Sequence, residues 1–553
     1  MTTVTHQHAS PGRLPELALS ILALGIGLLI YILSRGEVPA DFAKTAAVFG
    51  ATALIGHLLI RVAAPYADPV LYPTVIVING ISLAVLHRLD PKDAASQSLY
   101  TIMGVIVAIV VLFAVQDHRT LRRFTYTSLV VGILLLLMPL LPVIGREIYG
   151  ARIWIRLGPL TAQPAELAKI ILAVFFAGYL VVNRDNLALA GRKVLGLQLP
   201  RLRHFAPLVV AWVACLAVLV GQKDLGTAVL FFGLFVSMLY VATDRLSWMI
   251  IGAVLAGAGG FAAVKMFPHV MARFHVWLHA MEPAVYEAKH GSYQVVQAHF
   301  GMAAGGLLGT GLGEGTPGVV PQANSDFIIS TIGEELGMAT VFAILCLYLV
   351  LVIRGLRTAS YVRDGFGKLL AAGLSFTIAL QVFVVVGGVT RLIPLTGLTL
   401  PFLAKGGSSL LCNWLVLGLL LRISNAARRP QGRAAEPLPP AWEDIDEADD
   451  SDEQVVEEAH RDRPGHDVPR WSSSASRRVT AGGSAPGGAA AGTIGGTAGD
   501  VAGAAETEAS RADGPTELAG PPRADEADAG RADQRRDDDW DDDDRPTEAV
   551  RIR

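Results

Sequence analysis

The chain has 553 residues, of which 52% are hydrophobic and 17% charged, and its mean hydropathy is +0.45. This composition is too apolar for an ordinary water-soluble enzyme of this length. The formal charge is −3, so there is no overall basic excess, and we expect no nucleic-acid partner. Three cysteines lie singly in apolar stretches, without disulfide or zinc-site spacing, and are expected to be buried: Cys215, Cys346 and Cys412.

From about Leu14 to Arg422 the chain is a series of apolar stretches, each near the roughly 20 residues that a helix needs to cross a membrane. The sequence therefore predicts an all-α fold, a polytopic integral membrane bundle of about 10–12 transmembrane helices surrounded by membrane lipids. The first stretch is expected to be an uncleaved anchor. We place spans at residues 17–33, 43–63, 70–88, 100–116, 125–143, 166–183, 206–221, 224–243, 247–266, 326–354, 367–388 and 408–425.

The distribution of Lys and Arg predicts the orientation of the chain. Four connections rich in these residues are expected in the cytoplasm: 117–124, 184–206, 355–366 and the end of the last span at 422–429. With twelve spans, both termini are then cytoplasmic. Three further segments are expected on the outer face: 144–165, 267–325 and 389–407.

After about Arg428 the composition changes to Pro, Gly, Ala, Ser, Asp, Glu and Arg, with an acidic run from Asp537 to Asp544. Such a segment cannot bury enough apolar surface to fold, so we expect a disordered cytoplasmic tail. We interpret its aspartates as a solvated charge run rather than as metal ligands. The predicted organisation is N-terminal helices at 1–143, a core at 144–427 and a tail at 428–553.

Several charged residues lie at the start of the core. Arg152 and Arg156 are one helical turn apart if the stretch is helical, and two interpretations are open. They are either interfacial anchors or an outward-facing site for a lipid-linked pyrophosphate. Glu166 and Lys169 are spaced i, i+3 and are expected to pair. Asp224 interrupts a long apolar run, and a helix cap is its favoured role.

The outer segment 267–325 is long enough to be functional. Its carboxylates Glu282 and Glu287 are either solvated loop charges or reactive groups. A ladder of glycines from Gly305 to Gly315 lacks the strand, turn and helix frame of a dinucleotide fingerprint. We expect it to let the backbone approach a neighbour or a ligand closely.

The following span is expected to begin with Ser325 or Asp326 as its cap. Within it, Glu334 and Glu335 are buried glutamates, which favour function over packing. The last outer segment combines helix breakers with two cations, Arg391 and Lys405, at membrane depth. Irregular backbone is allowed there only where it lines a cavity or is buried in protein, so we expect a cationic pocket for an anionic headgroup.

Five sequence blocks lie between about Gly150 and Ile423: GARIWIRLGPLTAQPAELAK, QKDLGTA, the GSYQ to GLGEG stretch, NSDFIISTIGEELG and GGVTRLIPLTGLTLPFLAKGGSSLL. Together they resemble the SEDS family (shape, elongation, division and sporulation) of bacterial cell-wall polymerases, which includes RodA, FtsW and SpoVE. The unbroken GGVTRLIPLTG and the Ala, Gly, Arg and Asp-rich tail are most similar to an actinobacterial RodA.

This resemblance implies an inverting peptidoglycan glycosyltransferase that polymerises lipid II on the outer face of the cytoplasmic membrane during elongation or division. It also implies a class B penicillin-binding protein transpeptidase as partner. The acceptor's C4 hydroxyl displaces undecaprenyl pyrophosphate, which requires a carboxylate base and positive charge. No cofactor follows from the sequence, and a divalent cation is an open alternative.

Family members carry an aspartate between the loop proline and the Tyr-Gln pair, where this chain has none. Glu287 is the nearest carboxylate and the expected catalytic base, with Glu282 in reserve. The residues expected to bind substrate lie on the outer segments and the adjoining spans: Arg152, Arg156, Lys169, Arg391, Lys405, Ser408 and Glu335.

Two further departures concern the pocket and the first helices. Ala404 and Lys405 stand where the family has Ser and Tyr, and five apparent spans precede the first block instead of three. The missing aspartate favours one alternative function, a catalytically weakened scaffold for a penicillin-binding protein. The other alternative is a lipid II flippase, although the chain lacks the internal repeat of a transporter.

Overall fold

The computed structural model describes residues 14–35, 39–148, 151–157, 160–188, 193–194, 197–198, 202–288 and 291–430. The chain divides into two units, Met1–Glu443 and Asp444–Arg553, and every described residue lies in the first. The tail that we expect to be disordered therefore lies almost entirely outside the described residues.

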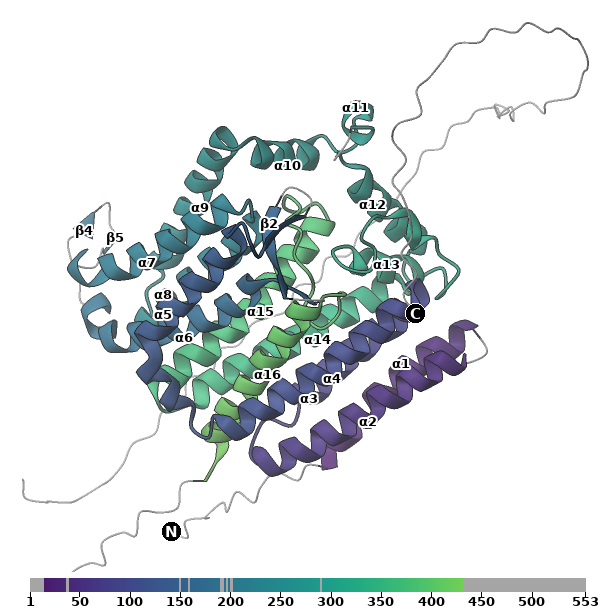
Figure 1. Ribbon diagram of the computed structural model, residues 1–553, viewed down its shortest axis with the longest axis horizontal. Helices are drawn as coiled ribbons and strands as arrows, with labels where there is room; N and C mark the ends of the chain where they lie inside the picture. The colour runs from purple at the N-terminus through teal and green to yellow at the C-terminus, as the bar shows by residue number, and fades with distance from the viewer. Residues whose placement is uncertain are drawn as a thin grey trace, which may run out of the picture. The chain divides into compact units, whose positions relative to one another are not determined.

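Helices make up most of the described chain (Figure 1). They are α1 (Leu14–Arg35), α2 (Ala40–Ala63), α3 (Leu71–Leu89), α4 (Pro91–Ala114), α5 (Thr125–Leu137), α6 (Pro164–Ala188), α7 (Leu202–Gly221), α8 (Leu225–Thr243), α9 (Ser247–Met266), α10 (Pro268–Leu278), α11 (Pro283–Tyr286), α12 (Tyr293–Gly305), α13 (Ile328–Glu335), α14 (Gly337–Tyr361), α15 (Gly365–Val389) and α16 (Gly407–Arg428). Three 3-10 helices are η1 (His118–Phe124), η2 (Met138–Leu140) and η3 (Pro317–Val319). Within the described ranges, 10 helical segments are long and apolar enough to cross a membrane. This confirms the prediction of an all-α, multi-pass membrane protein.

Aspartates begin several of these helices, because a side-chain oxygen accepts from a backbone N–H that the helix leaves unpaired. Asp90 accepts from Lys92 N at the start of α4. Asp224 accepts from Thr227 N at 3.0 Å at the start of α8, which confirms its expected role as a cap.

The central helices of the bundle pack closely, whereas others keep large apolar faces outward. α3 is 89% buried and α9 only 11%. A Cβ atom at Gly104 on α4 would lie 2.2 Å from Cδ1 of Trp414 on α16, so only glycine allows this approach. Cys215 and Cys412 are buried as expected, but Cys346 is exposed on the outward face of α14, which corrects the prediction for that residue.

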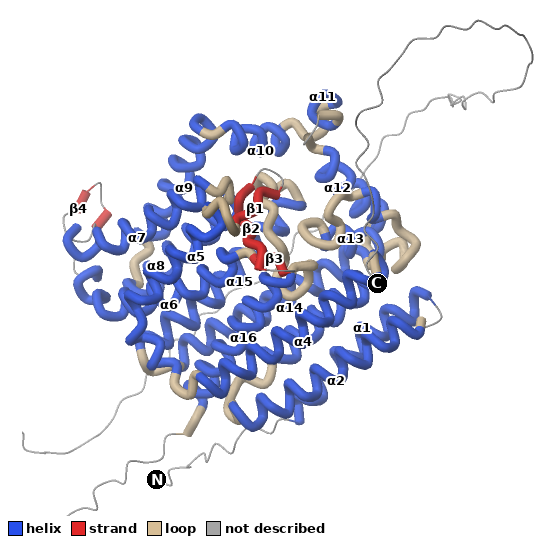
Figure 2. Tube along the Cα trace, in the orientation of Figure 1, coloured by secondary structure: helices blue, strands red, loops and turns tan. Residues whose placement is uncertain are grey.

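A three-stranded antiparallel sheet lies at one end of the bundle (Figure 2). Its strands are β1 (Gly145–Ile148), β2 (Ala151–Leu157) and β3 (Leu160–Ala162), and a separate hairpin joins β4 (Lys193–Val194) and β5 (Leu197–Gln198). Arg152 and Arg156 therefore lie on a strand, and the helical spacing considered for them is wrong. They still share one face, because side chains at i and i+4 of a strand point the same way.

The span expected at 326–354 is also corrected. It is divided into the short α13 and the long α14 at Gly337, whose φ of 78° is in the left-handed region. Glu334 and Glu335 thus end the short helix instead of lying in a transmembrane one. Phe327 occupies the N-cap position without a side-chain hydrogen bond, so neither Ser325 nor Asp326 caps α13.

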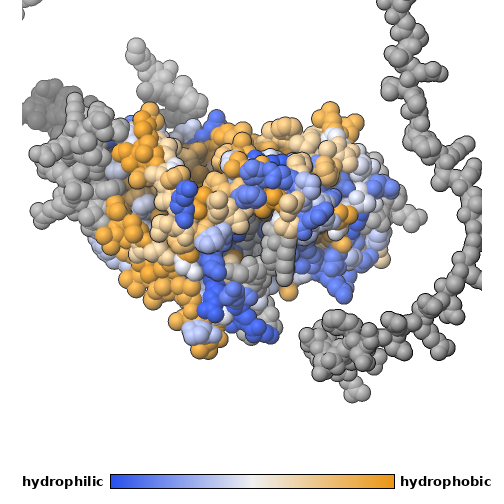
Figure 3. Space-filling model, turned by 90° about the horizontal axis from the view of Figure 1, so that it is seen from above, coloured by the Kyte–Doolittle hydropathy of each residue, from blue (hydrophilic) through white to orange (hydrophobic). Residues whose placement is uncertain are grey.

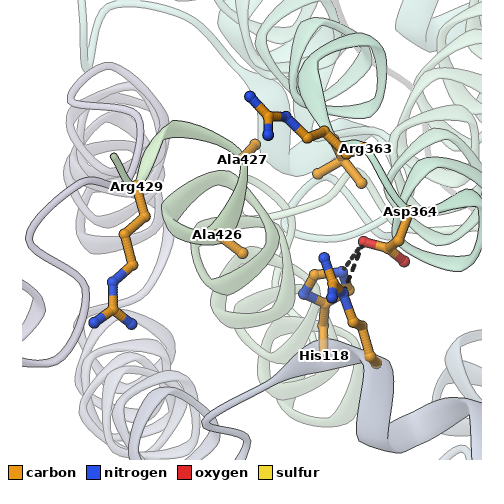
Figure 4. Close-up of a pocket in the computed structure, with 8 residues that line it drawn as sticks. His118, Arg363, Asp364, Ala426, Ala427 and Arg429 are labelled. Carbon is orange, nitrogen blue, oxygen red and sulfur yellow. Dashed lines mark hydrogen bonds and ion pairs between the residues drawn. The ribbon is translucent and has the colours of Figure 1, made fainter. Parts of the chain in front are cut away.

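Three of the connections expected in the cytoplasm meet at one end of the bundle (Figure 4). His118 Nε2 lies 2.8 Å from Asp364 Oδ2, and this pair borders a small recess while the Arg429 side chain points away from it. Burial alone would raise the pKa of Asp364, but hydrogen bonds from His118 and Gly367 lower it to about 2. Three of the four basic connections thus share one end, and much of the fourth, 184–206, lies outside the described residues.

The three segments expected on the outer face meet at the opposite end. Gln163 N donates to Ser408 Oγ at 3.2 Å, which joins the start of α6 to α16. Trp277 on α10 contacts Arg391. Seen from this end, hydrophilic residues gather at the centre and right of the face, and hydrophobic ones cover its left (Figure 3). The bundle therefore has a cluster of polar and charged residues at each end.

Asp68, in the connection between α2 and α3, should stabilise the basic end. It is fully buried, pairs with Arg428 and lies 3.6 Å from Nη1 of Arg354. We expect Asp68→Asn to lower the free energy of unfolding by about 1–3 kcal/mol. This is less than the loss expected when a fully buried ion pair is broken, because both arginines are partly exposed. Thermal unfolding in detergent measures this, with exposed Asp244→Asn as the control. Equal midpoints for both variants would contradict the assignment.

Candidate active site

The site is organised by residues 390–406, a segment without helix or strand that follows α15. We call it the 390–406 segment. Its carbonyl groups accept hydrogen bonds from buried side chains of four helices, which is the condition for irregular backbone at membrane depth. The donors and their acceptors are Gln381 to Thr399, Tyr348 to Pro401, Asn79 to Phe402, Ser82 to Leu403 and Gln97 to Ala404.

Beneath this segment lies a buried ion pair of α6. Lys169 Nζ is 2.7 Å from Glu166 Oε2, and both side chains are at most 5% exposed. The expected i, i+3 pairing is therefore confirmed. Lys169 also donates to Gln381 Oε1 at 2.7 Å, and Gln381 in turn holds the 390–406 segment. The lysine is thus connected to the 390–406 segment through one amide side chain.

Lys405 has a carboxylate partner on another helix. Its Nζ lies 2.5 Å from Asp93 Oδ1 on α4, and Asn324 donates to the other oxygen of Asp93 at 2.6 Å. Lys405 N donates to Asn324 O, so three distant parts of the chain close one small network. The lysine that replaces the family's tyrosine is therefore accommodated by a charge on α4.

Glu335 is 1% exposed and lies 2.9 Å from Arg88 at the end of α3. Arg88 also donates to the carbonyl groups of Gly313 and Gly315. Gly309 has a φ of 87°, and a Cβ there would lie 2.3 Å from Glu335 O. The glycine ladder therefore lets its backbone approach a neighbour, the α13 helix, as predicted.

The other expected cations occupy different surroundings. Arg391 donates to Trp277 O at 2.9 Å, while Trp277 Nε1 donates back to Arg391 O at 2.8 Å. This reciprocal contact fixes α10 to the 390–406 segment. Arg152 is half exposed and pairs with Glu147 at 3.4 Å. Arg156 is exposed on the same strand.

Glu287 follows α11 and its side chain is exposed. Within the described ranges, no ion pair or hydrogen bond joins it to Arg152 or Lys405. The reserve residue Glu282 is also exposed and lies 2.7 Å from His279. The loop around them is held by Ser292, which donates to Ala280 O at 2.6 Å.

Sequence reasoning missed a second charged group at this end. Arg273 of α10 donates from Nη1 to the carbonyl oxygens of Leu395 and Thr396. Its charge acts on both Asp224 and Asp326. The polar interruptions QKD and NSDF were the available signal, but both suggested helix caps. In the part of the chain that is described, no group of three or more His, Cys, Asp or Glu side chains has the arrangement of a metal site.

A family model described as cell cycle protein, covering FtsW, RodA and SpoVE, matches residues 67–429. The chain is 47% identical over 404 residues to the peptidoglycan glycosyltransferase RodA of Mycobacterium tuberculosis, covering 71% of this chain and 85% of that protein. It is 45% identical over 429 residues to RodA of Mycobacterium leprae, covering 74% and 90%.

A solved structure titled "Structural coordination of polymerization and crosslinking by a peptidoglycan synthase complex" superposes with a TM-score of 0.54 at 26% identity. The match covers 66% of this chain and 99% of that chain. The family match spans more than half of the chain and includes α3 to α16. The chain therefore belongs to the FtsW, RodA and SpoVE family, the SEDS family that its five motifs indicate.

Proposed function

We propose that this chain is a peptidoglycan glycosyltransferase that polymerises lipid II into glycan strands on the outer face of the cytoplasmic membrane. The observation that carries this function is a gathering of three segments at one end of the bundle. Trp277 of 267–325 contacts Arg391 of 389–407, Gln163 of 144–165 contacts the adjoining first turn of α16, and Arg152 and Glu147 add charge beside them. The relatives named RodA support the same activity. It would serve cell elongation or division.

The orientation that fits this function places both termini in the cytoplasm. Support comes from the basic connections, which gather at the end opposite the proposed site. In this arrangement, residues 144–427 form the polymerase core. Residues 1–143 supply the preceding helices, and 428–553 form the cytoplasmic tail.

The proposed reaction uses the acceptor's C4 hydroxyl as nucleophile and inverts the anomeric carbon of the donor. Glu287 takes the proton of that hydroxyl, and its exposure lets it reach an acceptor that arrives from outside. Four cations stabilise the leaving pyrophosphate: Arg152, Arg156, Arg391 and Lys405.

Three further residues complete the proposed substrate site from below. Lys169 and Ser408 lie on α6 and α16 beneath the 390–406 segment, and Glu335 holds Arg88 at the glycine ladder. Each has a described hydrogen bond or ion pair: Lys169 with Gln381, Ser408 with Gln163 and Glu335 with Arg88. In this arrangement the three residues lie beneath the bound headgroup.

A class B penicillin-binding protein transpeptidase is the proposed partner, because the superposed structure is titled as a complex of polymerisation and cross-linking. One observation favours a second function, a scaffold for that partner. Glu287 is exposed, and Lys405, Lys169 and Arg391 already have protein partners. Polymer formation separates the two functions.

Glu287→Gln keeps the size of the side chain but removes the base. With the full-length chain, its penicillin-binding partner and lipid II, we expect the polymerisation rate to fall by about 10²–10⁴-fold. Glycan products are separated by length on gels. The matched control is Glu314→Gln, an exposed glutamate of the same outer segment, which should polymerise at the rate of the unaltered chain.

Other outcomes identify what has failed. A fully active Glu287→Gln variant moves the base to another carboxylate, and an inactive Glu282→Gln variant would then identify the reserve residue. Absence of polymer from the unaltered chain with every partner would support the scaffold and contradict the enzyme.

Two roles are proposed for Lys169, in stability and in substrate binding, and a pair of variants separates them. Lys169→Met alone leaves Glu166 buried without its cation and should cost about 3–5 kcal/mol of stability. Glu166→Gln with Lys169→Met removes both charges, so thermal stability should largely return. If Lys169 also serves the substrate, the double variant stays inactive in polymerisation although it folds. Full activity would restrict Lys169 to stability, and exposed Lys368→Met is the control.

A further inference from the structure

A charged group that the proposed mechanism does not use lies beside the 390–406 segment. Arg273 donates to two consecutive carbonyl oxygens of this segment, at 2.9 and 3.0 Å. The same arginine acts on two carboxylates from other parts of the chain, Asp224 and Asp326. One arginine of α10 thus holds the 390–406 segment directly, and its positive charge is felt by carboxylates at the start of α8 and in the turn before α13.

Close approaches place the Asp326 carboxylate and the first turn of α8 along the same short stretch. A Cβ atom at Gly397 would lie 3.6 Å from Oδ2 of Asp326. A Cβ atom at Gly226, two residues after Asp224, would lie 3.0 Å from Thr396 O. Asp326 and the start of α8 thus border neighbouring residues of the segment.

The two carboxylates differ in access. Asp224 is 7% exposed, and while Oδ1 caps α8, Oδ2 is buried and accepts no hydrogen bond from the described residues. A buried carboxylate oxygen without a donor is costly, which points to a ligand or a proton at this place. The side chain of Asp326 is partly exposed and therefore more accessible than that of Asp224.

Burial raises the pKa of Asp326 to about 6, although Arg273 and a hydrogen bond from Ser325 oppose the rise. Burial also raises the pKa of Asp224 and lowers that of Arg273. Asp326 is therefore a carboxyl that holds its proton at higher pH than usual. Among the described residues, the other titratable and charged groups around this cluster are Glu166 beside Asp224, Lys223 and His269 beside Arg273, and, through Asn324, the pair of Asp93 with Lys405.

We propose that Asp326 is the general acid of the polymerisation reaction, an assignment that rests on the proposed function. As the acceptor oxygen bonds to the anomeric carbon, its proton passes to the base. The bond from that carbon to the pyrophosphate oxygen breaks, and the electron pair stays on this oxygen, which takes the proton of Asp326. Asp326 regains a proton from solvent as the base releases one. The positive charge of Arg273 stabilises the carboxylate that Asp326 forms when it gives up its proton.

The assignment fixes the sign of a pH dependence. Only the protonated form of Asp326 donates, so the rate falls as pH rises through about 6. The negative charge of a bound pyrophosphate raises the pKa of a neighbouring carboxyl further, which moves this alkaline limb upward in the complex. A division of two carboxyl groups between acid and base is common where their surroundings differ.

The test measures polymerisation from pH 5 to 9 with the full-length chain, the class B partner and lipid II. The amide of Asp326→Asn cannot transfer a proton to the leaving oxygen. We therefore expect kcat to fall by about 10²-fold or more with little change in KM, and the alkaline limb of the pH profile to disappear. Asp326→Glu should restore part of the rate and the limb. Asp244→Asn, at an exposed αL position at the end of α8, is the matched control and should keep both.

The pH profile of Arg273→Gln distinguishes a general acid from a residue that only supports the fold, because a purely structural role of Asp326 would leave the alkaline limb where it is. Glutamine can still donate to the carbonyl groups, but the positive charge that lowers the pKa of Asp326 is gone. The alkaline limb should therefore shift to higher pH. If Asp326→Asn fails to fold, as judged by gel filtration, this shift decides the question, and an unmoved limb overturns the assignment.

The outcomes separate this assignment from the function on which it rests. If the unaltered chain polymerises and Asp326→Asn does so with an equal rate and pH profile, only the general acid is overturned. If the unaltered chain makes no polymer with any partner, the proposed function fails, and the assignment fails with it.

Discussion

The 390–406 segment imposes the constraint on which the rest of this end depends. A stretch without regular structure at membrane depth must find hydrogen-bond donors in the protein, because lipid offers none. Here α3, α4, α14 and α15 each supply at least one buried side chain, and Arg273 of α10 supplies two hydrogen bonds. Five helices are therefore held at fixed positions around one segment, and the charged residues that they carry are fixed with them.

This arrangement explains why most cations of the site are already paired. Lys169 contacts Glu166 on α6, Lys405 contacts Asp93 on α4, and Arg88 contacts Glu335. Unpaired charges at such depth would be costly, whereas an ion pair with further hydrogen bonds is tolerated. The arginines of β2 are instead exposed, so water solvates their charge, and Arg152 also pairs with Glu147. The sheet thus carries positive charge at the protein surface without the cost of burying it.

Periodicity and local pairing were predictable from the sequence, because they depend on neighbouring residues. The membrane spans, the Asp224 cap and the Glu166–Lys169 pair all belong to this class. The strand β2 was missed although Arg-Ile-Trp-Ile-Arg alternates with period two, since apolar surroundings favoured a helix. The contact of Arg273 with residues more than 120 positions away depends on packing, which no local pattern shows.

The two carboxylates proposed for the reaction illustrate how position determines chemistry. Glu287 ends a short helix on an exposed loop, so solvent and an arriving acceptor both reach it. Asp326 lies half-buried against the 390–406 segment, where burial keeps a proton on its carboxyl up to a pH of about 6. A group that receives a proton benefits from access, and one that donates it benefits from burial. The same segment that must be sheltered from lipid therefore also supplies the burial that a general acid needs.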